Sequence, residues 1–128
     1  MARRLGLVTI VVRDYDAALD FYVGALGFEL AEDTDLGDGK RWLVVSPGEG
    51  GARLLLAKAD GPAQAARIGD QTGGRVGFFL MTDDFMTDHA AMVARGVKFH
   101  EAPRHESYGI VAVFEDIAGN LWDMIERR

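Results

Sequence analysis

A pattern of strand, acidic cap, helix, glycine and strand occurs twice in this chain of 128 residues. Asp14 precedes the first helical segment and Gly27 follows it, while Asp84 and Gly96 hold the same places around the second. Aspartate is a favoured helix N-cap, and glycine commonly follows a helix C-terminus. The two caps are 70 positions apart (84 minus 14) and the two glycines 69 (96 minus 27). This recurrence predicts two copies of one supersecondary unit.

Both segments between cap and glycine have the apolar spacing of an amphipathic helix. The first places Ala18, Phe21, Tyr22 and Ala25 on one face, and the second places Phe85, His89, Met92 and Val93 there. We interpret His89 as a partly buried residue of helix packing, because it lies within this apolar stripe.

Short apolar strands separated by Gly-rich turns surround the helices. In the first half we expect strands at residues 5–12, 28–30, 41–45 and 53–57, with a turn at 35–39; in the second half, at 76–81, 97–99, 108–115 and 121–126. The sequence therefore predicts an α+β fold of two tandem βαβββ modules, residues 5–58 and 74–128. A linker at 59–73 would join them within a single domain, residues 1–128.

Composition excludes several classes of function. The chain has 14 basic and 20 acidic residues and a formal net charge of −6, which disfavours nucleic acid because binding to it rests on neutralising phosphates. No apolar run approaches the roughly 20 residues of a membrane span. The absence of cysteine excludes disulfides, thiolate nucleophiles and Cys-type zinc sites. We expect a cytoplasmic protein with neither a nucleic-acid nor a membrane partner.

The closing strand contains one acidic residue among large apolar ones. Because alternate strand residues face opposite ways, Leu121, Asp123 and Ile125 share one face. Trp122 and Met124 share the other. A carboxylate that shares a face with two aliphatic side chains lies either at the rim of the fold or in a site.

A set of short motifs carries a family resemblance along both halves. They are residues 8–14 (VTIVVRD), 18–22 (ALDFY), 26–28 (LGF), Asp84, Gly96-Val97, Tyr108-Gly109 and 114–120 (FEDIAGN). Together they resemble the vicinal oxygen chelate superfamily, which includes glyoxalases, extradiol dioxygenases, fosfomycin-resistance enzymes and bleomycin-binding proteins. The resemblance implies that each module curves its sheet into half of a cup, with helices outside and the ligand inside. It also implies a homodimer.

The resemblance further implies four metal-ligand positions, normally filled by His and Glu. Here they are occupied by Leu7, by residues 53–56, which contain neither an acid nor a histidine, by Gly77 and by Asp123. A catalytic metal site uses about three protein ligands, and only one such group is present. We therefore expect no cofactor, with a divalent metal at Asp123 as the alternative.

Without a metal, the cup implied by the resemblance becomes an apolar pocket for a small organic molecule. Phe79, Met81 and Trp42 are the candidate walls, and His100 and Tyr108 are further ligand-binding candidates.

Asp123 is the candidate catalytic residue, either an anchor for a ligand or, if burial raises its pKa, a general base. The alternative is a structural ion pair of Asp123 with Arg41 or Arg75. We expect a small-molecule-binding glyoxalase-like protein. The alternative is an atypical lyase, isomerase or dioxygenase-like enzyme that uses Asp123 as its base or sole retained metal ligand.

Overall fold

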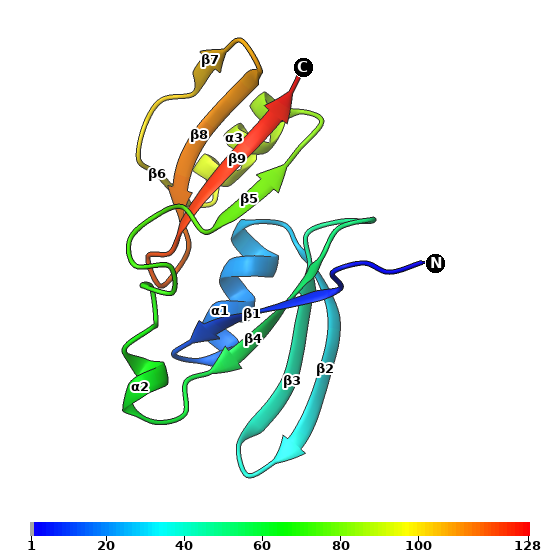
Figure 1. Cartoon of the computed structure of the whole chain (residues 1–128), viewed down its shortest axis with the longest axis vertical. Helices are drawn as coiled ribbons and strands as arrows, with labels where there is room; N and C mark the ends of the chain where they lie inside the picture. The colour runs from blue at the N-terminus through cyan, green and yellow to red at the C-terminus, as the bar shows by residue number, and fades with distance from the viewer. Residues whose placement is uncertain (1) are drawn as a thin grey trace. The chain divides into compact units, whose positions relative to one another are not determined.

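The computed structural model describes residues 2–128, and the chain divides into two compact units, Met1–Ile68 and Gly69–Arg128. Each unit contains one β-sheet, and Figure 1 shows a helix against one face of each sheet. Within the described residues, no helix is long and apolar enough to cross a membrane.

The first unit has a four-stranded sheet in the order β1-β4-β3-β2. Its elements are β1 (Leu7–Val12), α1 (Tyr15–Leu19), η1 (Asp20–Ala25), β2 (Glu29–Gly37), β3 (Lys40–Ser46), β4 (Arg53–Lys58) and α2 (Pro62–Ala65). Strands β1 and β4 are parallel, whereas β2–β3 and β3–β4 are antiparallel.

The second unit repeats this arrangement, with its strands in the order β5-β9-β8-β6. Its elements are β5 (Phe78–Met81), α3 (Phe85–Ala94), β6 (Lys98–Phe99), β7 (Arg104–Glu106), β8 (Gly109–Glu115) and β9 (Leu121–Arg127). In both units the first strand pairs in parallel with the last strand. The predicted α+β class is confirmed. Strand β7, which pairs with β8, was not predicted.

Both predicted helix caps are confirmed. The Asp14 carboxylate accepts a hydrogen bond from the backbone N–H of Ala17 at 2.8 Å, and the Asp84 carboxylate accepts one from Thr87 at 3.3 Å. Each cap satisfies one of the free N–H groups of a first helical turn.

The predicted apolar faces of the helices are only partly correct. In the first unit Ala18 and Tyr22 are buried but Phe21 and Ala25 only half-buried, because α1 continues into the wider π-helical turn of η1 and the helical spacing changes. On α3, Val93 was wrongly assigned to the buried stripe and is 50% exposed.

His89 packs as predicted. Its ring stacks on Phe85 at 5.6 Å between centroids and meets Phe99 at 4.4 Å. The imidazole therefore belongs to the layer between α3 and the sheet.

Strand β2 is longer than predicted, and the turn expected at residues 35–39 is shorter. The chain turns at Asp38 and Gly39, which both have positive φ, 55° and 78°. Positive φ at both positions is typical of a type I′ hairpin turn. The extension was missed because β2 is exposed along most of its length, so it lacks the apolar alternation that identifies a strand.

The core of the second unit lies between α3 and its sheet. Its largest buried side chains are Phe85, Met92, Phe114, Trp122 and Met124. Trp122 stacks between Phe78 and Phe114, at 4.9 and 5.6 Å. The predicted alternation along β9 is thus confirmed, because Trp122 and Met124 pack toward the helix.

The turn before β9 is organised by the buried carboxylate of Asp116. One oxygen accepts hydrogen bonds from the backbone N–H groups of Ala118, Gly119 and Asn120, at 3.0 to 3.1 Å. The other accepts from the Asn120 amide at 2.9 Å and from the Trp122 indole at 3.3 Å. This turn fixes the direction in which β9 begins.

Candidate ligand-binding site

The site candidate lies on the face of the second sheet opposite α3, which we call the helix-free face. Its residues from β5, β8 and β9 alternate with those packed against the helix; they are Phe79, Met81, Val111, Val113, Glu115, Leu121, Asp123 and Ile125. Asp123 lies in the middle strand of the three, with Phe79 as its partner on β5 and Val113 as its partner on β8. The carboxylate is therefore flanked on both sides by hydrocarbon.

Asp123 has a buried oxygen without a hydrogen-bond partner. Among the described residues, its Oδ1 atom is the only buried side-chain oxygen or nitrogen in this condition. Burial raises the pKa of the Asp123 carboxyl, Arg104 opposes that rise through its charge, and Glu101 adds to it. Since nearly all buried polar groups in folded proteins are paired, this oxygen calls for an explanation.

The predicted alternative, a structural ion pair of Asp123 with Arg41 or Arg75, is wrong. Arg41 binds Asp16 at 2.7 Å and Asp33 at 2.8 Å within the first unit. Among residues 2–128, Asp123 forms no ion pair.

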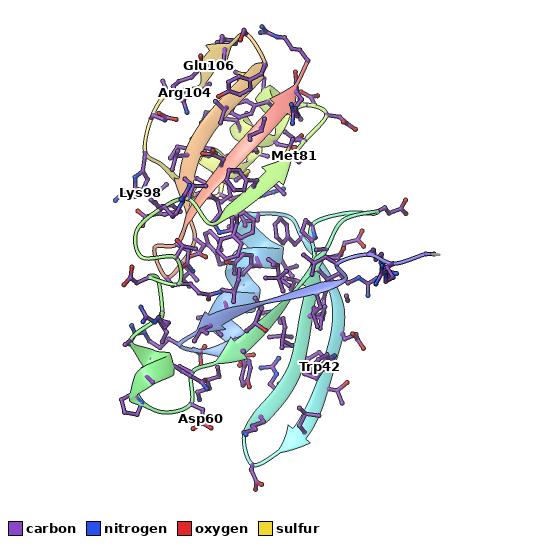
Figure 2. All side chains as sticks on the ribbon, in the orientation of Figure 1. Trp42, Asp60, Met81, Lys98, Arg104 and Glu106 are labelled. Atoms are coloured by element: carbon purple, nitrogen blue, oxygen red, sulfur yellow. The ribbon has the colours of Figure 1, made fainter. Side chains whose placement is uncertain are left out.

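Two groups of ion pairs border the helix-free face. In the first, Arg104 donates to Glu101 at 2.9 Å and to Glu106 at 3.1 Å. Glu101 also accepts a hydrogen bond from the backbone N–H of Val113, the neighbour of Asp123, at 3.3 Å. Strand β7 places Arg104 opposite Val111, on the same side of the sheet as Asp123. Figure 2 shows Arg104 and Glu106 together at this edge.

The second group is centred on Glu115. Its Oε1 atom lies 3.1 Å from Lys98 Nζ and 3.4 Å from His100 Nε2. The hydrogen bond and the charge of Lys98 lower the pKa of the Glu115 carboxyl, and His100 acts in the same direction. His100 continues the line of the sheet, because its backbone N–H donates to the Val113 carbonyl at 2.8 Å.

The predicted wall residues Phe79 and Met81 lie on the helix-free face and are 58% and 52% exposed; Figure 2 shows Met81 on β5. Tyr108 lies farther from Asp123, in the turn between β7 and β8. Trp42 belongs to the first unit, where it points away from α1 and donates to Glu32 at 3.3 Å. Ligand binding by these residues and by His100 remains a prediction.

Sequence reasoning missed Glu101, Arg104 and Glu115 as neighbours of the site. In the sequence, Glu101 and Arg104 lie in a segment interpreted as a loop, and Glu115 ends the strand expected at residues 108–115. The pairing of β7 with β8 brings Arg104 to this side of the sheet, and Glu101 meets Val113 through the hydrogen bond from its backbone N–H. The available signal was weak, an alternation of charge along residues 104–106.

A hollow of about 430 Å³ lies elsewhere, at the β2–β3 hairpin of the first unit. Its lining is polar and includes Asp33, Asp35 and Asp38. The carboxylate of Asp33 is held by Arg41, and that of Asp35 accepts the N–H of Gly37. Two of its three acids therefore already have hydrogen-bond partners within the hairpin. No large apolar side chain is among the residues that line the hollow.

Residues 4–124 match the family described as the Glyoxalase/Bleomycin resistance protein/Dioxygenase superfamily. The chain belongs to this superfamily. The predicted resemblance is confirmed, and so is the superfamily fold, since solved structures of members align with nearly the whole chain.

Three proteins similar to this chain illustrate the range of similarity. An uncharacterised protein of Shewanella frigidimarina is 53% identical over 121 residues, which cover 93% of this chain and 90% of the relative. The crystal structure of UcmS2 aligns with a TM-score of 0.83 and 31% identity over 98% of each chain. TnmS3, an antibiotic binding protein from Streptomyces sp. CB03234, aligns with a TM-score of 0.79 and 30% identity, over 99% of this chain and 98% of its own.

The residues of this chain do not fit the divalent metal of the superfamily enzymes. A Cβ atom at Gly77 would lie 2.5 Å from Thr72 Cγ2, and Thr72 is fixed by a 2.6 Å hydrogen bond to the Arg75 carbonyl. A ligand side chain at this position would therefore have to displace Thr72. Leu7 offers no donor atom, and residues 2–128 hold no group of three His, Cys, Asp or Glu side chains arranged around a common centre.

Proposed function

We propose that this superfamily member binds a small organic molecule, antibiotics being one such class, on the helix-free face of the second unit and without a metal ion. The observation that carries the proposal is the buried, unpartnered Oδ1 of Asp123 beside two exposed apolar side chains, Phe79 and Met81. A ligand with a polar group and an apolar body would satisfy both.

In the absence of a ligand, the helix-free face carries two unfavourable contributions to the free energy. A buried polar atom without a partner costs about 1–3 kcal/mol, and exposed large apolar side chains add unburied surface at about 25 cal/mol per Å². Both costs fall when a ligand covers Phe79 and Met81 and the Asp123 carboxylate turns to accept a hydrogen bond from it. A fold that retains both costs in the free state is consistent with a site kept ready for binding.

The comparison with TnmS3 supports this proposal, because that protein is an antibiotic binding protein and shares both fold and about a third of its sequence with this chain. We further propose that the chain acts as a homodimer in the cytoplasm. Light scattering on the purified protein tests the dimer, and a mass of one chain contradicts it.

A thermal-shift screen against thioesters, catechols and cationic antibiotics tests the function. A ligand at a hundred times its dissociation constant stabilises the folded protein by about 2.7 kcal/mol. The expected hit raises the melting temperature of the wild type and of Glu49→Gln, an exposed turn variant with the same charge change. It raises that of Asp123→Asn much less. Equal stabilisation of all three proteins contradicts the role of Asp123.

The raised pKa of Asp123 favours a second candidate, an enzyme in which this carboxylate is the general base. General-base catalysis contributes typically 10²- to 10⁴-fold. Chromatography of a bound hit over several hours tests it: a product that forms with wild type and not with Asp123→Asn favours the enzyme, and an unchanged hit contradicts it.

A further inference from the structure

Some carboxylates on the helix-free face form an ion pair with a basic side chain of the protein, and one does not. Glu101 and Glu106 share Arg104, at 2.9 and 3.1 Å. Glu115 has Lys98 at 3.1 Å. Asp123 is the fourth carboxylate on this side of the sheet, and within residues 2–128 it forms no ion pair at all.

Arg104 is the cation whose charge acts on Asp123, but its guanidinium is already bound elsewhere. Arg104 lowers the pKa of Asp123 by its charge, yet its guanidinium is bound to two carboxylates on either side of it in sequence. Turning it toward Asp123 would break the Glu101 contact, and Glu101 also holds the N–H of Val113. The fold therefore leaves the cation of Asp123 to be supplied from outside.

The surroundings of Asp123 specify what else that cation should carry. Phe79 is the partner of Asp123 on the neighbouring strand, and adjacent strands lie about 4.8 Å apart. Phe79 is more than half exposed, and Met81 continues the apolar surface two residues along β5. Aromatic rings and the methionine thioether pack well against an aromatic ligand.

We infer that the ligand is an arylalkylamine, whose ring packs on Phe79 and Met81 while its ammonium group, a short spacer away, donates to the Asp123 carboxylate. This inference rests on the proposed binding function and adds to it the chemical class of the ligand. An ammonium group is favoured over a neutral donor because it adds the attraction between opposite charges to the hydrogen bond that either donor makes with the carboxylate.

A matched set of three probes separates charge from shape. Phenethylamine, 2-phenylethanol and 3-phenylpropionate share a ring and a two-carbon spacer and carry a cation, a neutral donor and an anion. Each is titrated into the ¹⁵N-labelled full-length chain at pH 7.5, and amide shifts of Phe79, Val113 and Asp123 report binding at the site. The amine is expected to bind about tenfold more tightly than the alcohol, the factor that corresponds to 1.4 kcal/mol, and the carboxylate least.

Two variants locate the charge preference. Asp123→Asn is expected to reduce the affinity for phenethylamine to that for 2-phenylethanol, which it leaves unchanged. Glu49→Gln removes the same charge from an exposed turn and is expected to alter neither affinity by more than twofold. A preference for the amine that survives Asp123→Asn would overturn the inference, as would amine shifts centred on the acidic β2–β3 hairpin.

Failure of the inference and failure of the proposed function give different results. If the three probes bind the helix-free face equally, or the alcohol binds more tightly, the amine preference is wrong and the binding function stands. If none of the probes shifts Phe79, Val113 or Asp123 at 10 to 20 mM (about 100-fold above protein), the inference is wrong, and the antibiotic screen alone decides the function.

Discussion

Replacing Asp123 by asparagine is expected to stabilise the free protein at neutral pH. The substitution keeps the size of the side chain and removes the charge from a site where one oxygen is buried without a partner. An unsatisfied buried group costs about 1–3 kcal/mol. Because Asp123 is only half-buried and asparagine is still polar, we expect a gain of about 1 kcal/mol. In a chain of this size that raises the melting temperature by about 3–5 °C.

The gain should depend on pH with a defined sign. Burial raises the pKa of Asp123 in the folded protein above its ordinary value, so in the interval between the two values the folded protein binds more protons than the unfolded chain. Stability then falls as pH rises through that interval. The difference between Asp123→Asn and wild type should be small near pH 3.5 and reach its full value above the raised pKa.

Urea unfolding of both proteins between pH 3.5 and 7.5, followed by tryptophan fluorescence, measures this difference. Glu115→Gln is the control of opposite sign, because Lys98 lowers the pKa of Glu115. The stability contributed by Glu115 is present above the ordinary carboxyl pKa and is lost as pH falls through the lowered pKa of the folded protein. Glu115→Gln should therefore be less stable than wild type at pH 7. The reasoning is refuted if Asp123→Asn is less stable than wild type at pH 7, or if its advantage does not change with pH.

Three further substitutions test the fold around the site, each by urea unfolding. Asp116→Ala should cost about 3–5 kcal/mol, because it leaves a buried set of N–H donors without their acceptor; a loss below 1 kcal/mol contradicts that role. Phe79→Ala should change stability by less than about 1 kcal/mol, while the fully buried Phe85→Ala should cost about 3–5 kcal/mol; equal losses would show that Phe79 is core. Gly77→Ala should cost about 1–3 kcal/mol, because the added Cβ collides with Thr72. Adding Thr72→Ser, which removes Cγ2, should restore most of the lost stability; no recovery in the double variant contradicts the collision.

Local signals in the sequence were sufficient to predict the repeated strand and helix framework. The caps Asp14 and Asp84 were predictable because a carboxylate before a helix binds N–H groups only a few residues away. The two faces of β9 were predictable because alternation along a strand is likewise local. Asp123 was therefore placed on the correct side of the sheet.

Features that depend on strand register could not be predicted in the same way. Arg104 reaches the surroundings of Asp123 through the pairing of β7 with β8, and β7 has three residues without apolar alternation. The block at Gly77 by Thr72 was equally hidden, since a glycine in sequence does not show which side chain fills the space beside it. The unpartnered oxygen of Asp123 is a property of these pairings.

Methionine methyl NMR tests the binding site most directly. Met81 on the helix-free face and Met86 on α3 are both 52% exposed, so they are matched reporters for the two sides of the second unit. With ¹³C-methyl methionine and a hit from the ligand screen, we expect a saturable shift of Met81 that is lost in Asp123→Asn, with Met86 unchanged. A shift of Met86 with Met81 unmoved, or a Met81 shift that persists unaltered in Asp123→Asn, would contradict binding on the helix-free face through Asp123.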